Sequence, residues 1–197
     1  YVSKHHAGKN WSERLIIPNE PKINMAITGD YIPCDIMIVG VETLRKRINL
    51  LQLWVDYAVS QNIIDKNPKI VIVGDIPKRN GGLSLRNIDV SYHSPDKMMS
   101  FVPLNDKSVY LSLSCEEGFN RGAMIGRKLG FKLQLSDIPV HKEFFPDAQF
   151  FSVNANNVIE RSSAASSNRR SEEAVTWASN EKVERRKQAL SNIISNG

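Results

Sequence analysis

Residues with reactive side chains cluster after one apolar segment of the chain, where Ser114 and Cys115 are followed by Glu116 and Glu117. No Gly-x-Ser-x-Gly sequence surrounds Ser114, so it does not match the sharp turn that exposes a hydrolase nucleophile. Neighbouring residues on a strand point to opposite faces, so the two glutamates are not expected to flank one scissile bond. Cys115 is expected to be an unreactive core or surface residue.

The histidines and cysteines give no sign of a metal site. His5, His6, His93 and His141 have neither an HxxxH nor an HxE spacing, and no cysteine lies near them in sequence. The chain has two cysteines, Cys34 and Cys115, and they lie far apart in sequence. This argues against a disulfide framework and favours a reducing compartment. We therefore predict no metal, no cofactor and no catalytic constellation: the chain is expected not to be an enzyme.

A nucleotide-binding unit is an alternative. The apolar segment Asp35–Gly40, an amphipathic segment and a second apolar segment, Lys69–Asp75, have the order of a βαβ unit. No GxGxxG and no GK[ST] follows the first segment, and Gly81-Gly82 precedes no helix start. A nucleotide-dependent α/β enzyme is thus an alternative with weak motif support.

Basic residues are the more prominent feature. The net charge of +5 and a pI of about 9.2 favour anionic partners such as nucleic acid. Single-stranded nucleic acid binds positive surfaces that also carry stacking aromatics. The residues predicted to contact it are Arg45, Lys46, Arg47, Lys78, Arg79, Arg121, Arg127 and Lys128. The alternative is a set of solvated charges that share no face.

Elements that could position these residues are mostly short strands. Apolar runs bounded by Pro, Gly, Asn or Asp predict strands at Leu15–Ile17, Lys22–Thr28, Ile36–Val41, Lys69–Gly74, Ser108–Ser114 and Phe150–Val153. Phe131, Leu133 and Leu135 alternate in the same way, as do Val109, Leu111 and Leu113, which is typical of a sheet with one buried face. Many short strands at this spacing predict a sandwich or a barrel.

Two segments are less regular. Between Glu42 and Ile64 helical and alternating spacings compete, and we predict a short helix through about Arg47 followed by a strand from Asn49 to Ser60. After Asn156 the composition becomes rich in Ser, Ala and charge, with an apolar stripe that predicts a helix from Glu172 to Ile194. The predicted organisation is a flexible segment 1–9, a β-sandwich core 10–157 and a charged, helical tail 158–197.

The middle of the chain resembles the 30K superfamily of plant-virus movement proteins. The apolar stretch Asn49–Val59 leads through a polar loop to Ile70–Val73 and Asp75. This order is similar to the family's signature, in which a strand closes on an aspartate with an aliphatic residue two positions earlier. Downstream, Val109–Ser114 and Gly122 resemble a later strand and its glycine, and the Phe150–Arg161 stretch resembles the closing segment in movement proteins of segmented negative-strand plant viruses.

The resemblance implies a mainly β fold: a jelly-roll-like antiparallel β-sandwich with a few short helices and a C-terminal helical tail. It implies a viral cell-to-cell movement protein that binds single-stranded RNA or nucleocapsid and carries it through plasmodesmata, with tubule formation as one route. The implied partners are single-stranded RNA or viral nucleocapsid protein, further copies of the chain, and host plasmodesmal or membrane proteins. The implied location is the host cytoplasm and plasmodesmata. The alternative is a jelly-roll capsid or nucleocapsid structural protein.

Three residues carry the family motif, namely Val73, Asp75 and Gly122. We expect the Asp75 carboxylate to accept backbone N–H bonds and fix the turn at the strand end, which is a structural role. Gly122 suits either a positive φ or close packing.

Overall fold

A computed structural model of the chain describes residues 31–40, 44–74, 85–86, 88–154 and 158–162. The predicted strands Leu15–Ile17 and Lys22–Thr28 lie outside these residues, as do the N-terminal segment 1–9 and the tail helix Glu172–Ile194. The limits predicted for the three segments of the chain stay predictions.

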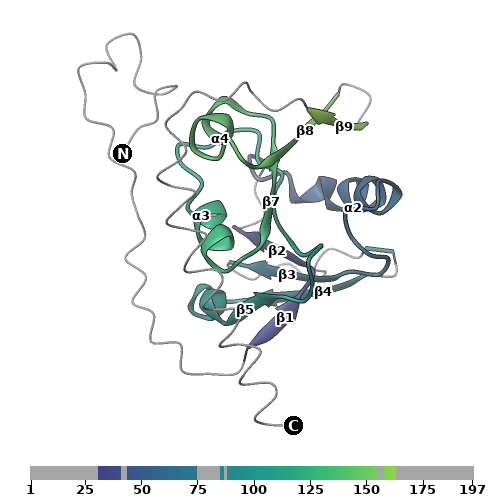
Figure 1. The fold of residues 1–197 in the computed structure, drawn as a ribbon, viewed down its shortest axis with the longest axis vertical. Coiled ribbons are helices and arrows are strands. Elements are labelled where there is room, and N and C mark those ends of the chain that lie inside the picture. The colour runs from purple at the N-terminus through teal and green to yellow at the C-terminus, as the bar shows by residue number, and fades with distance from the viewer. Residues whose placement is uncertain (1–30, 41–43, 75–84, 87, 155–157, 163–197) are drawn as a thin grey trace, which may run out of the picture.

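The described chain combines strands with helices (Figure 1). Its strands are β1 Ile32–Cys34, β2 Ile36–Val39, β3 Lys69–Val73, β4 Asp89–His93, β5 Phe101–Pro103, β6 Val109–Ser112, β7 Lys132–Ser136, β8 Gln149–Val153 and β9 Ile159–Ser162. Its α-helices are α2 Leu51–Ser60, α3 Arg121–Lys128 and α4 Pro139–Phe144, and its 3-10 helices are η2 Ile48–Leu50 and η3 Pro95–Ser100.

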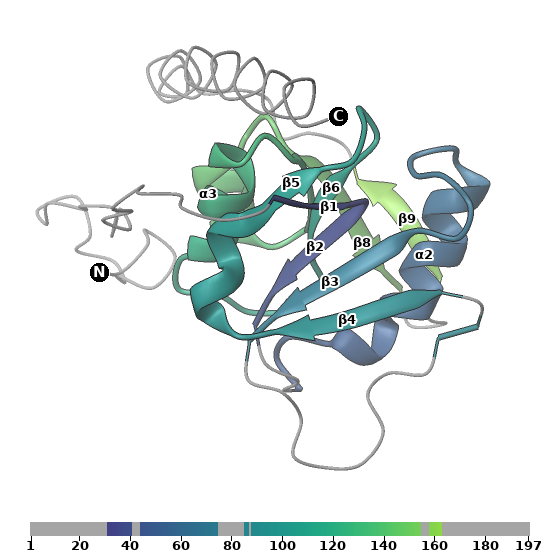
Figure 2. The same cartoon turned by 90° about the horizontal axis from the view of Figure 1, so that it is seen from below.

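One seven-stranded sheet, in the order β4-β3-β2-β6-β7-β8-β9, organises the chain, and a small parallel pair, β1-β5, accompanies it. Every neighbouring pair in the large sheet is parallel except β8 and β9, which are antiparallel. The predicted jelly-roll-like antiparallel β-sandwich is therefore wrong. The fold is α/β and doubly wound, with α2 on one face of the sheet and α3 on the other (Figure 2).

The sandwich was predicted because the strands were expected to bury only one face, whereas several of them are covered on both faces. Strands that are covered on both faces are apolar at nearly every position, whereas strands with one solvent face alternate. All four residues of β6 are buried, including Tyr110 and Ser112, which occupy the positions between the alternating apolar residues Val109, Leu111 and Leu113. The positions of β2, β3, β6, β7 and β8 were thus predicted from the apolar runs, but their parallel direction was not.

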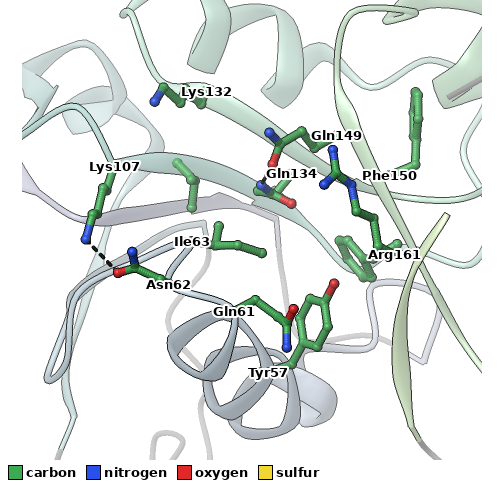
Figure 3. A pocket seen from close by; sticks show the side chains of 12 residues that line it. Tyr57, Gln61, Asn62, Ile63, Lys107, Lys132, Gln134, Gln149, Phe150 and Arg161 are labelled. Atoms are coloured by element: carbon green, nitrogen blue, oxygen red, sulfur yellow. Dashed lines mark hydrogen bonds between the residues drawn. The ribbon is translucent and has the colours of Figure 1, made fainter. Parts of the chain in front are cut away.

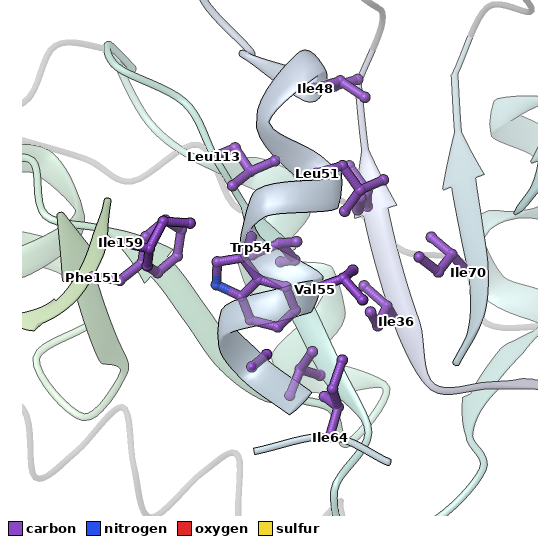
Figure 4. Packing of buried hydrophobic residues seen from close by; sticks show 14 of the residues in the cluster. Ile36, Ile48, Leu51, Trp54, Val55, Ile64, Ile70, Leu113, Phe151 and Ile159 are labelled. Atoms are coloured by element: carbon purple, nitrogen blue, oxygen red, sulfur yellow. The ribbon is translucent and has the colours of Figure 1, made fainter. Parts of the chain in front are cut away.

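Helix α2 replaces the predicted strand from Asn49 to Ser60. Leu51, Trp54, Val55 and Ala58 are its buried residues, at the i, i+3, i+4, i+7 spacing of one helix face. They pack on one face of the sheet, together with side chains such as Ile36 (Figure 4). The strand propensity of Trp54 and Val55 is overridden, because the helical arrangement buries all four residues against the same surface. The βαβ order that we treated as an alternative is therefore present in β2, α2 and β3.

Helix α3 packs closely against the face of the sheet opposite α2, because the residues of the helix at the contact are glycines. A Cβ added to Gly126 would lie 2.6 Å from Cβ and Cγ of Tyr110, and one added to Gly122 would lie 2.8 Å from Cβ of Val39. Atoms cannot approach so closely, so both positions require glycine. For Gly122, which is helical, close packing rather than a positive φ accounts for the residue.

We expect Gly126→Ala to lower the free energy of unfolding by about 2 kcal/mol, because the added methyl group overpacks the contact with Tyr110. This loss already includes the gain of about 1 kcal/mol in helix propensity. Gly118→Ala is the matched control, since no atom lies within 4 Å of a Cβ added there. Urea denaturation measures both, and equal stability of the two variants would contradict the packing described.

Candidate functional site

The carboxyl edge of the sheet is the side on which its parallel strands end, and it contains the point where the order of the strands reverses. The sheet starts at β2 and grows outward through β3 and β4, after which β6 pairs with the other side of β2. The segment after β2 leads to α2 on one face, and the segment after β6 leads to α3 on the other. In open α/β sheets, ligands bind in the crevice outside the carboxyl ends of strands at such a switch point.

At this switch point the segments that follow β2 and β6 are tied together. The backbone N–H of Cys115 donates to the carbonyl oxygen of Arg45 over 3.0 Å. Nε of Arg47 donates to the carbonyl oxygen of Leu113 over 2.8 Å. Arg47 has a positive φ of 48°, a conformation that is uncommon for residues other than glycine, so the turn is held by its surroundings.

Lys46 lies inside the crevice. A Cβ added to Gly40, which has φ 142°, would lie 3.1 Å from Cε of Lys46, so the lysine stem rests directly on the glycine. The Lys46 ammonium forms an ion pair with Glu117, whose side chain is buried. This ion pair joins the end of β2 to the end of β6. A cavity of about 10 Å³ lies beside Lys46, lined by residues of β2, of β6 and of the segments that follow them, such as Ile48 and Ser114.

A continuous chain of hydrogen bonds runs inward from this ion pair. Ser114 Oγ donates to Glu117 Oε1 over 2.8 Å, and Ser112 Oγ donates to Ser114 Oγ over 3.3 Å. Nδ2 of Asn120 donates to Ser112 Oγ over 3.0 Å. All four residues are buried, so their polar groups are satisfied by one another, as buried polar groups must be.

Asn120 is the centre of this network. It is the N-cap of α3, and its Oδ1 accepts from the backbone N–H of Ala123 over 3.0 Å. The same oxygen accepts from the hydroxyl of Tyr110 over 3.2 Å. Burial raises the pKa of Tyr110, so this hydroxyl stays protonated and donates.

His141, on α4, completes the network from the other side. Its Nδ1 donates to the carbonyl oxygen of Ser136 over 2.8 Å, so Nε2, 3.0 Å from Nδ2 of Asn120, is the acceptor. The ring is fully buried, and this burial lowers the pKa of His141 below its usual value. Since both ring nitrogens are occupied, the neutral imidazole positions Asn120 and does not act as a general base.

The predicted basic residues that the structure describes fall into two groups. Arg45, Lys46 and Arg47 lie at the switch point, and Arg121, which is exposed, opens α3 near the same edge. Arg127 and Lys128 lie in the last turn of α3, about 9–10 Å further along the helix.

Arg127 has a local partner. It pairs with Asp147 and lies 5.1 Å from the ring centroid of Phe145. Its burial lowers the pKa of the guanidinium. Lys78 and Arg79 lie outside the described residues, so whether any of these basic residues contacts nucleic acid stays a prediction.

The residues of the family motif are partly outside the described chain as well. Val73 is buried at the end of β3, and Gly122 is buried in α3. Asp75 is not among the described residues, so its expected turn-fixing role stays a prediction.

Sequence reasoning missed the residues that form the polar network. The sequence predicts Glu116 and Glu117 on opposite faces of a strand, but both follow the end of β6, where Glu117 is buried and Glu116 is exposed. His141 was set aside because no metal-ligand spacing surrounds it. The available signal was a run of polar residues directly after buried apolar strands, which marks the carboxyl edge of a parallel sheet.

The described residues form neither a metal cluster nor a membrane-spanning helix. No group of three or more His, Cys, Asp or Glu residues within them is placed to hold a metal ion. None of their helices has the length and hydropathy that a transmembrane span requires.

Comparisons with known proteins give limited information. No family model matches the chain, and no curated protein matches it. Among solved structures, the chain is similar to TarM, with 20% identity over 92% of this chain and 34% of the other, at a TM-score of 0.43. It is also similar to the GtfA/B complex, with 18% identity over 78% of this chain and 29% of the other, at a TM-score of 0.41. The chain therefore spans about a third of the length of these proteins, and neither TM-score reaches 0.5.

The prediction that the chain is not an enzyme is corrected. It followed from the absence of a sequence motif and from the expected β-sandwich. The sheet is instead doubly wound, with a buried network of ionisable and polar groups at its switch point. Fold and site together define an α/β domain with a buried polar network at the carboxyl ends of β2 and β6.

The buried His141 makes stability depend on pH. Its pKa is lowered in the folded state, so the unfolded chain binds more protons below the ordinary histidine pKa of about 6.5. We therefore expect the free energy of unfolding to fall as the pH drops below about 6.5, by up to about 1.4 kcal/mol per pH unit. Urea titrations from about pH 7.5 down to about pH 5 measure this slope.

His141→Gln should reduce that slope, whereas His93→Gln should retain it, because His93 lies outside the network, bonded to Ser91. An unchanged slope in His141→Gln would contradict the assignment of the neutral ring.

Proposed function

We propose that this chain is a nucleotide-binding domain of an enzyme, and that it holds its ligand in the crevice between the carboxyl ends of β2 and β6. The observation that carries the proposal is the Lys46–Glu117 ion pair and its buried hydrogen-bond network, at the switch point of a doubly wound sheet.

The charges around the crevice favour a phosphate-bearing ligand. Lys46 lies in it, and Arg45 and Arg121 stand at its rim. The amino end of α3 opens at the same edge, and the amino end of a helix carries a partial positive charge. The ammonium of Lys46 is held by Glu117 in the unliganded chain, and a phosphate group would compete with this carboxylate for it.

Hydroxyl groups are the second feature that this site would recognise. The Glu117 carboxylate accepts bonds from Ser114 and Lys46 and has further acceptor capacity. A carboxylate beside a cation suits a ribose or another sugar, whose hydroxyls donate, attached to a phosphate. A nucleoside diphosphate or a nucleoside diphosphate sugar therefore fits the chemistry of the crevice best.

Cell-to-cell movement, capsid assembly and RNA binding remain predictions of the family resemblance. No feature of the described residues favours them over ligand binding at the switch point.

Binding of nucleotides tests the proposal. Calorimetric titration of the full chain with ADP, UDP, GDP and UDP-glucose should reveal one binding ligand class. Lys46→Met should weaken it at least about tenfold, which corresponds to the loss of one hydrogen bond to a charged group. Glu117→Gln should weaken the sugar-bearing ligand more than inorganic pyrophosphate, because the carboxylate faces hydroxyls rather than phosphate.

Matched controls are Lys97→Met and Glu160→Gln, whose side chains are exposed on other elements. Both should bind as the parent chain does. A folded chain that binds none of these ligands, or Lys46→Met binding as tightly as the parent, would refute the proposed function.

A further inference from the structure

A second concave site lies at the opposite edge of the sheet. A cavity of about 300 Å³ opens between the end of α2 and the amino ends of β6, β7 and β8 (Figure 3). It is lined by Tyr57, Gln61, Asn62, Ile63, Lys107, Val109, Lys132, Gln134, Gln149, Phe150, Phe151 and Arg161. Its volume is at the lower end of the range for small-molecule sites. We refer to it as the amino-edge groove.

All the charged side chains that line this groove are positive. Lys107, Lys132 and Arg161 line it, and no aspartate or glutamate does. Lys107 is compensated, since its ammonium lies 2.8 Å from Oδ1 of Asp65 and 2.9 Å from Oδ1 of Asn62. Within the part of the chain that the structure describes, no side chain pairs with the ammonium of Lys132 or the guanidinium of Arg161. Two uncompensated cations around one concave surface attract an anion.

Hydrogen-bonding groups lie between these cations. The side-chain amides of Gln134 and Gln149 bond to each other, with Nε2 of Gln134 donating to Oε1 of Gln149. Figure 3 shows this amide pair between Lys132 and Arg161. Gln134 is 4% exposed, so its orientation is fixed by packing, and the bond in turn orients Gln149. The bond uses Oε1 of Gln149 and leaves its Nε2 group, on an exposed residue that lines the groove, with two N–H donors for an anion.

The groove also has an apolar wall. Ile63, Val109 and Phe151 line it, and Val109 and Phe151 belong to the core beneath α2. The hydroxyl of Tyr57, at the end of α2, adds a further donor. A ligand that fills the groove therefore needs a charged group at the cations and a carbon body against the wall.

We propose that the amino-edge groove binds a small organic phosphate, a phosphate ester whose dianionic group contacts Lys132, Arg161 and Nε2 of Gln149. A phosphate matches the site better than a single carboxylate because it carries two charges for two cations and has three terminal oxygens for three donors. This site is separate from the switch point, which lies at the opposite edge of the sheet, and it does not rest on the proposed function.

Titration of the isotope-labelled full chain with inorganic pyrophosphate, at constant ionic strength, tests this site. The side-chain amide signals of Gln134 and Gln149 should shift, and the double variant Lys132→Gln with Arg161→Gln should weaken the fitted affinity at least about tenfold. The control double variant, Lys97→Gln with Arg86→Gln, removes the same charges from exposed positions on other elements and should leave the affinity unchanged.

Equal weakening in both double variants, or shifts absent from Gln134 and Gln149, would overturn the proposal. A single-stranded oligonucleotide that binds through the same amide signals more tightly than pyrophosphate would also overturn it, in favour of an extended nucleic-acid surface. Signals near Lys46 report the switch point separately, so a failure at one site is distinguishable from a failure at the other.

Discussion

The side-chain amide of Asn120 is the interaction on which the described fold and its site both depend. Its oxygen caps α3 and accepts the Tyr110 hydroxyl, and its nitrogen donates to Ser112 and to His141. One side chain thus fixes α3, the end of β6 and α4 relative to one another. An amide makes this possible because it has both an acceptor and two donors, and a buried position requires that all of them are used.

The close approach of α3 to the sheet follows from the same region. Glycines at positions 122 and 126 let the helix backbone approach Tyr110, and that approach places Asn120 at the carboxyl edge. From there the hydrogen bonds continue through Ser112 and Ser114 to the Lys46–Glu117 ion pair. The site is therefore built on strands, a helix start and a buried network, which hold functional groups more rigidly than surface loops do.

The carboxyl and amino edges of the sheet differ in whether their basic side chains have acidic partners. At the carboxyl edge, Lys46 is paired internally, and the crevice is nearly filled, so a ligand must displace an existing interaction. At the amino edge, Lys132 and Arg161 face an open groove and have no partner among the described residues. A single sheet thus presents a closed polar site and an open cationic one, on opposite sides of the same core.

The sequence by itself determined where the strands β2, β3, β6, β7 and β8 lie, because a buried strand must be a short apolar run between turn residues. It also contained the βαβ order of β2, α2 and β3, although strand-forming residues such as Trp54 and Val55 concealed the helix. It did not determine the direction of the strands, because an apolar run is compatible with either direction. Only the tertiary structure decided that Tyr110 and Ser112 are buried, that Glu117 meets Lys46, and that His141 meets Asn120. These pairs are 71 and 21 residues apart, and local propensity carries no information on contacts that form only when distant segments pack together.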